Sequence, residues 1–307
     1  MKDISRRKFL SYSSGLFVLS VSDLADINIA ATPPLSFSTL GCPDWSFDQI
    51  VGFAVQHNYS GIEIRGVQRE LDLSKSPHFN TSSAIAETRK KIADKKLKIV
   101  GLGSSAAMHH AAKSDREKAF DEAKRFIDIA SKVGCPYVRV FPDKLPKEQE
   151  KQKTLDLITE GLSTLASHAK GSGVKVLMET HGDVVYVDDI VSVMNAVTAR
   201  SNVGLIWDIS NMWMVTKESP TQVYGKLKKW IEHTHLKDLK LVDGKAQYTL
   251  TGMGEVPAFE AVDLLMQDGY KGFLSFEWEK MWHPEIEEPE VAIAQFSRRM
   301  QEHFKAK

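Results

Sequence analysis

Four short apolar segments in the second half of the chain each carry an acid or a histidine near their end. They read KVLMETHG (residues 175–182), VGLIWDISN (203–211), IEHTHLKD (231–238) and GFLSFEWEK (272–280). Segments of this length, rich in Val, Ile, Leu or Phe, are typical of buried β-strands. Similar segments occur earlier in the chain, at residues 35–41, 61–66, 99–105 and 137–142. The sequence therefore predicts eight strands.

Amphipathic stretches between these segments predict helices. The clearest lie at residues 81–95, 115–133, 148–170 and 257–267. Strands that alternate with helices form right-handed βαβ units and a parallel sheet. Eight such units within residues 32–307 predict a single-domain (β/α)8 TIM barrel. A doubly wound open sheet is the main alternative, but no GxGxxG motif opens the first helix.

The first residues differ in character from the rest of the chain. Residues 5–10 read SRRKFL, a twin-arginine signature, and the mildly apolar stretch after it, residues 10–21, is too short to span a bilayer. Small residues permit cleavage near Ala31. We predict a twin-arginine signal peptide at residues 1–31 and a mature protein in the periplasm or elsewhere outside the cytoplasm. The alternative is a disordered terminus with a chance arginine pair.

The bulk composition excludes some partners. Lys and Arg together number 40, as do Asp and Glu, so the formal net charge is zero. A nucleic-acid partner would favour a basic surface, and no segment after the leader is long enough for a membrane span. We expect a small-molecule substrate, no nucleic acid and no membrane span in the mature form. Cys42 and Cys135 fall at opposite ends of the predicted barrel, which predicts two free thiols.

The ionisable residues of the last four predicted strands indicate a metal site. Side chains two residues apart share a face of a strand, and the carboxyl ends of parallel barrel strands meet at one end of the barrel. A buried charge is costly unless it is paired or bound to a cation. The predicted ligands, one from each strand, are Glu179, Asp208, His235 and Glu277. Three carboxylates and one imidazole favour Mn²⁺, with Mg²⁺, Co²⁺ or Zn²⁺ as alternatives.

Several stretches of this sequence resemble the xylose-isomerase-like barrel superfamily, in particular its sugar phosphate isomerase/epimerase branch. They are GIEIR (residues 61–65), METHG (178–182), WDISN (207–211), HTHLKD (233–238), GMGEVP (252–257) and SFEWE (275–279). The resemblance implies the same four metal ligands. It also implies that Glu179 and Glu277 transfer protons, as they do in the ketose epimerases of the branch. Dimers or tetramers are common in the branch, which implies a homo-oligomer.

Five further residues are predicted to contact substrate. They are Glu63, Arg139, His181, Asn211 and Lys237. Glu63 and Arg65 share a face of their strand, so they pair with each other in the alternative interpretation. A solvated side chain is the alternative for Lys237. Asn211 stands where many ketose epimerases of the branch have a histidine, so the identity of the substrate does not transfer from them.

The function predicted from these residues is a metal-dependent sugar isomerase or epimerase. A metal bound to neighbouring carbonyl and hydroxyl oxygens stabilises an enediolate, and an acid and a base then move the proton. The same chemistry supports a lyase or hydratase acting on a keto-sugar or keto-glycoside. A non-catalytic sugar-binding barrel is a third interpretation. An abasic-site nuclease of this fold is disfavoured by Asn211, which replaces a histidine, and by the zero net charge.

Overall fold

The structure is a computed structural model that describes residues 33–198 and 200–306. The predicted twin-arginine leader lies outside the described residues, so export and the periplasmic location stay predictions. None of the helices in the described ranges has both the length and the apolar character that crossing a bilayer requires.

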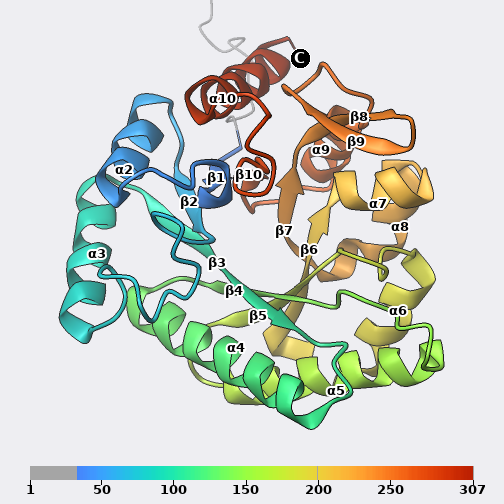
Figure 1. The fold of residues 1–307 in the computed structure, drawn as a ribbon. Coiled ribbons are helices and arrows are strands. Elements are labelled where there is room, and N and C mark those ends of the chain that lie inside the picture. The colour runs from blue at the N-terminus through green and yellow to red at the C-terminus, as the bar shows by residue number, and fades with distance from the viewer. Residues whose placement is uncertain (1–32, 199, 307) are drawn as a thin grey trace, which may run out of the picture. The chain divides into compact units, whose positions relative to one another are not determined.

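Eight parallel strands close into a barrel. These strands are β1 (Leu35–Ser38), β2 (Gly61–Ile64), β3 (Lys98–Ala107), β4 (Tyr137–Phe141), β5 (Lys175–Glu179), β6 (Val203–Asp208), β7 (Ile231–Leu236) and β10 (Leu274–Phe276). Their order around the barrel is β1-β10-β7-β6-β5-β4-β3-β2, and β1 pairs with both β2 and β10. The closed sheet confirms the predicted (β/α)8 barrel and rules out the open sheet (Figure 1).

Helices surround this sheet, as the alternating pattern predicted (Figure 1). They are α2 (Phe47–Gln56), α3 (Ser82–Asp94), α4 (Lys113–Val133), α5 (Lys151–His168), α6 (Val187–Ala196), α7 (Ile209–Thr216), α8 (Pro220–Leu227), α9 (Ala258–Gln267) and α10 (Pro289–Lys305), with 3₁₀ turns η1 (Thr39–Gly41), η2 (Arg200–Asn202) and η3 (Lys228–Trp230). Local chemistry sets several starts. Ser46 and Gln49 form a capping box before α2, and Ser219 with Gln222 does the same before α8.

An antiparallel hairpin follows the seventh barrel strand and was not predicted. Its strands are β8 (Asp238–Val242) and β9 (Lys245–Thr249). The two residues between them, Asp243 and Gly244, both have positive φ, at 51° and 74°. Asp-Gly favours this turn because both central residues must adopt positive φ. The hairpin rises beside α7 and α9 (Figure 1).

The strand register shifts at three places in the barrel, and two of them lie next to ionisable side chains of its interior. The β2–β3 pairing shifts between Ile62 and Glu63, and the β6–β7 pairing shifts between Leu205 and Ile206. Such bulges re-aim the side chains that follow them. Here the extra residues are Val100 on β3, beside Glu63, and Glu232 on β7, just before His233. Cys42 and Cys135 are both buried and free, as predicted.

Candidate metal centre

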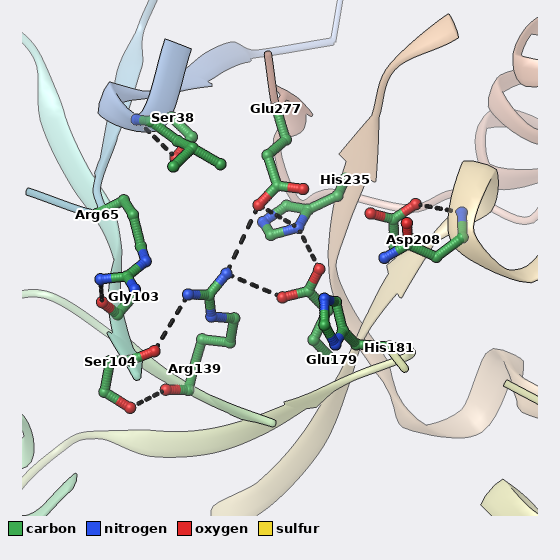
Figure 2. A network of polar contacts seen from close by, with 12 residues as sticks. Ser38, Arg65, Gly103, Ser104, Arg139, Glu179, His181, Asp208, His235 and Glu277 are labelled. Carbon is green, nitrogen blue, oxygen red and sulfur yellow. Dashed lines mark hydrogen bonds and ion pairs between the residues drawn. The ribbon is translucent and has the colours of Figure 1, made fainter. Parts of the chain in front are cut away.

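Four side chains from four neighbouring strands converge at the carboxyl end of the barrel. Glu179 ends β5, Asp208 ends β6, His235 lies on β7, and Glu277 follows β10 directly. Each offers one ligand atom, and these atoms all lie within 4.8 Å of one another. All four residues are at most 3% exposed. Figure 2 shows their polar groups directed toward a common region. The sequence thus predicted which four residues meet, and the structure brings them together.

The strand that carries Asp208 changes into a helix at that residue. The predicted strand 203–211 is too long, because Asp208 is the N-cap of α7 and its Oδ1 accepts a hydrogen bond from the Asn211 backbone N–H at 2.8 Å. Asn211 therefore lies in the first helical turn. Its amide donates to the Thr180 carbonyl oxygen at 3.4 Å. The backbone N–H of Asn211 thus fixes the Asp208 carboxylate. A contact between the Asn211 side chain and substrate stays a prediction.

The two ring nitrogens of His235 face different partners. Nδ1 lies 3.2 Å from Glu179 Oε1 and 3.2 Å from Glu277 Oε1. Nε2 lies 2.9 Å from Glu63 Oε2, on the side away from these two ligands. Glu277 keeps its place beside β7 because its backbone N–H donates to the Leu236 carbonyl at 3.0 Å, although the predicted strand 272–280 ends at Phe276.

Arg139 joins two of the candidate ligands. Its Nη1 donates to Glu179 Oε2 at 2.9 Å and lies 3.5 Å from Glu277 Oε1. Its Nη2 donates to the Ser104 carbonyl at 3.1 Å, and the guanidinium stacks over the Phe141 ring at 4.0 Å. Figure 2 shows the guanidinium between the two glutamates. Arg139 points inward, as predicted, and its carboxylate partners belong to the protein.

Lys237 is buried at the same end of the barrel. Only 2% of the residue is exposed, so the interpretation of a solvated lysine is wrong. Its ammonium contacts Asp208 Oδ2, lies 2.6 Å from Glu277 Oε2 and lies 3.1 Å from Glu279 Oε1. Burial would lower the pKa of Lys237, but Asp208 and Glu277 raise it well above its ordinary value. The side chain is therefore a permanent cation beside the candidate ligands.

The charges at this end of the barrel do not balance. Apart from Asp238, whose carboxylate accepts hydrogen bonds from backbone N–H groups, the acidic side chains with little exposure here are Glu63, Glu179, Asp208, Glu277 and Glu279, and the basic ones are Arg65, Arg139 and Lys237. With the histidines neutral, as His235 must be when it binds a metal, the five carboxylates exceed the three cations by two charges. A single divalent cation cancels that excess. Three oxygen donors and one imidazole nitrogen are ligands that Mn²⁺ and Zn²⁺ accept. The residues present therefore fit a divalent metal.

The crowding of like charges is visible in the pKa values. Burial, with the Glu277 and Glu179 carboxylates adding to it, raises the pKa of Asp208 to about 6 even though Lys237 opposes the shift. Burial would also raise the pKa of Glu277, but His235 and Lys237 hold it well below its ordinary value. One carboxylate of the group thus resists ionisation while its neighbours are ionised. A bound cation relieves that conflict.

His181 lies at the rim of this centre. It follows Glu179 by two residues, and its side chain is 38% exposed. Its Nδ1 lies 3.6 Å from Asp143 Oδ1, and its ring packs against Phe141 with centroids 4.4 Å apart. Burial would lower the pKa of His181, but Asp143 and Glu179 raise it above its ordinary value. His181 is accessible to a ligand, whereas the four candidate ligands are enclosed.

Glu63 and Arg65 do not pair in the way that the alternative interpretation held. Glu63 Oε2 lies 2.9 Å from Nε2 of both His233 and His235. Arg65 instead donates to the Gly103 carbonyl at 3.3 Å and to Ser105 Oγ at 2.8 Å. Glu63 thus reaches across the barrel to β7. A direct contact between Glu63 and substrate stays a prediction. In the structure Glu63 lies on the Nε2 side of His235, away from Glu179 and Glu277.

Sequence reasoning missed two residues that the structure places here. His233 contacts Glu63, and Glu279 contacts Lys237. The signal was present, because each lies two residues from a predicted ligand and therefore on the same face of its strand. The alternation of side chains along a strand does not show how deep the site is. It therefore did not predict that His233 and Glu279 would fit beside the four candidate ligands.

Comparison with known proteins gives the same fold. Residues 51–302 match the profile of a family described as xylose isomerase-like TIM barrel. A 3-dehydroshikimate dehydratase from Bacillus anthracis is 24% identical over 252 residues, 76% of this chain and 85% of the relative. An inosose dehydratase from Clostridium botulinum (strain Alaska E43 / Type E3) is 26% identical over 155 residues, 45% of this chain and 51% of the relative. The crystal structure of an IOLI protein with a bound zinc atom superposes with a TM-score of 0.73 at 17% identity, covering 88% of this chain and 97% of that one.

Proposed function

This chain belongs to the xylose isomerase-like TIM barrel family, and we propose that it is a metal-dependent lyase that removes water from a polyhydroxylated ketone. That the protein is a sugar-modifying barrel with a divalent-metal site is supported by its family and by the cluster of candidate ligands. That it removes water is supported by the hydrogen bonds and ion pairs of the ionisable groups around that cluster. Two dehydratases among the curated relatives support it.

A divalent cation held by the four ligands would supply Lewis acidity, which makes a C–H bond beside a ketone acidic. Glu179, Asp208, His235 and Glu277 would hold it. Lys237 donates hydrogen bonds from the edge of this group and keeps its proton, because its pKa is raised. Its three N–H donors already contact Asp208, Glu277 and Glu279, so it positions these carboxylates, and its contact with substrate stays a prediction. Mn²⁺ and Zn²⁺ are the cations we expect.

The observation that carries the proposal is that both ligand glutamates are fully engaged. Glu179 contacts His235 with one oxygen and Arg139 with the other. Glu277 contacts His235 and Arg139 with one oxygen and Lys237 with the other. Carboxylates held by cations are weak bases. His181, accessible at the rim, is the stronger candidate for the general base.

One imidazole can serve both halves of an elimination. His181 takes the proton from the carbon next to the ketone and returns it to the hydroxyl on the following carbon. The C–H and C–O bonds break, a C=C bond forms in conjugation with the ketone, and water leaves. No second base on the opposite face of the substrate is needed. The Asp143 carboxylate, 3.6 Å from Nδ1, favours the protonated imidazole that forms between the two steps.

Epimerisation is the second candidate, and one observation favours it. Glu179 and Glu277 come from β5 and β10, which are separated by β6 and β7 in the barrel, and both reach the same nitrogen of His235. They thus approach the centre from opposite sides, as a proton donor and acceptor on two faces of a carbon must. Both candidate reactions begin with loss of the same proton.

The test is to incubate the metal-loaded protein in D₂O with cyclic and open-chain polyhydroxylated ketones. A lyase gives a product lighter by one water, and turnover falls by about 10²–10⁴-fold in His181→Asn, which removes the base. His109→Asn is the matched control, because His109 Nδ1 lies 3.9 Å from the same Asp143. Deuterium in a product of unchanged formula would instead establish the epimerase. No exchange with any ketone would leave a binding protein.

A further inference from the structure

A buried carboxylate on β2 accepts hydrogen bonds from two histidines on β7. Glu63 Oε2 lies 2.9 Å from His233 Nε2 and 2.9 Å from His235 Nε2. The three residues are at most 2% exposed. The two imidazole rings stand nearly perpendicular, at 80°, with centroids 5.8 Å apart. Two donors at one oxygen fix both the position of Glu63 and the orientation of each ring.

This arrangement determines which nitrogen of His235 carries the proton. A carboxylate oxygen is an acceptor, so His235 must donate from Nε2. It is Nδ1 that lies 3.2 Å from Glu179 Oε1 and from Glu277 Oε1, among the candidate ligands. Without a cation Nδ1 also donates toward these carboxylates, and a bound cation takes the place of that proton and meets the Nδ1 lone pair. A hydrogen bond from the second ring nitrogen of a metal-binding histidine sets its tautomer and increases its basicity.

His233 keeps Glu63 in this position. Its Nε2 supplies the second hydrogen bond, while its Nδ1 has no hydrogen-bond partner in the structure. A buried N–H without an acceptor is rarer in proteins than an unpaired lone pair, so the proton of His233 belongs on Nε2. His233 is therefore a donor to Glu63.

The same three residues have the composition of a second metal site, but the geometry argues against one. A metal among them would need the Nε2 lone pair of His235. His235 already directs Nδ1 at the first centre, and an imidazole that binds two cations must lose both its protons. With a metal at the first centre, Glu63 and His233 thus act as hydrogen-bonding partners rather than as ligands.

The barrel leaves room for this contact. Gly101 on β3 lies beside Glu63, and a Cβ at that position would lie 3.2 Å from Glu63 Cγ. A methyl group there would crowd Glu63, which would have to shift by a few tenths of an ångström, without removing any polar atom. The β2–β3 register shifts just before this Glu63–Gly101 pair, and the extra residue, Val100, lies on β3.

We propose that Glu63 and His233 are positioning residues that lock His235 in its Nε2–H tautomer and so present Nδ1 to the metal. The inference rests on the metal centre of the proposed function, but not on which reaction follows. It predicts that metal affinity depends on a carboxylate that does not touch the metal.

The test measures Zn²⁺ affinity by competition with a chelating dye, together with the histidine ¹⁵N shifts of the zinc-loaded protein. In the wild type, we expect one zinc per chain and a His235 signal of the Nε2–H tautomer. Glu63→Gln retains the shape but replaces one oxygen by a donor, and should lower zinc affinity by about 10- to 100-fold. His233→Gln and Gly101→Ala should lower it in the same direction by smaller factors.

The matched control is Asp128→Asn, which removes a carboxylate 3.0 Å from Nε2 of the surface residue His168 and should leave zinc affinity unchanged. Zinc affinity within twofold of wild type in Glu63→Gln, a proton on Nδ1 of His235, or a second zinc that is lost in Glu63→Gln would each overturn the lock alone. A wild-type chain that binds no divalent metal would overturn the proposed function as well. Melting temperatures separate these effects from misfolding.

Discussion

The two ends of the barrel treat their buried and half-buried acids differently. At the amino end, Glu232 on β7 pairs with Lys175 on β5 at 2.5 Å and lies 3.5 Å from the Tyr137 hydroxyl. At the carboxyl end, five acids face three basic side chains. In the first arrangement one negative charge meets one positive charge, whereas in the second the negative charges exceed the positive charges by two. An acid with a local partner supports the fold, and an excess of acids indicates a bound cation.

The largest effect that would sharpen this comparison comes from removing one of the excess charges. Glu179→Gln and Glu277→Gln each take away a ligand and an anionic contact of His235. We expect both variants to lose turnover, with a drop in metal affinity beyond the about 10- to 100-fold typical of indirect partners. Steady-state rates and dye competition measure the two quantities. A variant that retained near wild-type turnover would remove that glutamate from the centre.

The next effect comes from adding or removing the cation. Metal at about 100 times its dissociation constant stabilises a folded protein by about 2.7 kcal/mol. For a domain of this size we expect the melting temperature to rise by about 5–10 °C on loading with Mn²⁺ or Zn²⁺, and to return after chelation. Differential scanning calorimetry with and without EDTA measures the shift. Equal melting temperatures would mean that the acids at the carboxyl end are balanced without a metal.

A third change tests a buried acid at the same end of the barrel that does not belong to the excess of negative charge. Asp238 accepts hydrogen bonds from the backbone N–H groups of Leu239, Gly252, Gly254 and Val256. Its charge is thus satisfied by the loop that it anchors. Asp238→Asn should cost about 1.5–3 kcal/mol of unfolding free energy, as expected for hydrogen bonds to a charged group, and leave metal affinity nearly unchanged. Urea denaturation and dye competition test this together, and a large loss of affinity would contradict it.

The smallest effect is expected at the amino end. Glu232→Gln removes a pair whose side chains are 29% and 38% exposed, and pairs of this kind contribute about 1 kcal/mol or less. We expect unchanged metal affinity and turnover, with a melting temperature within a few degrees of wild type. If Glu232→Gln altered metal binding as strongly as Glu63→Gln, the distinction between the two ends would fail.

The sequence by itself determined the eight barrel strands, the closed parallel barrel and the four side chains that meet as candidate ligands. It did so because burial enforces apolar strands, alternation fixes the face of each side chain, and parallel strands bring their carboxyl ends together. Asp208 and Glu277 were identified in this way although their strands end earlier than predicted. An error in the end of a strand does not change the side of the strand on which a side chain lies.

Only the tertiary structure decided which of these side chains contact each other. Glu63 was expected to contact substrate or, in the alternative, to pair with Arg65, but it contacts His233 and His235 on β7. Lys237 was expected either in solvent or on substrate, and it is enclosed among three carboxylates. Such contacts depend on register and depth across strands that are distant in sequence. Local propensity and periodicity contain no information about either.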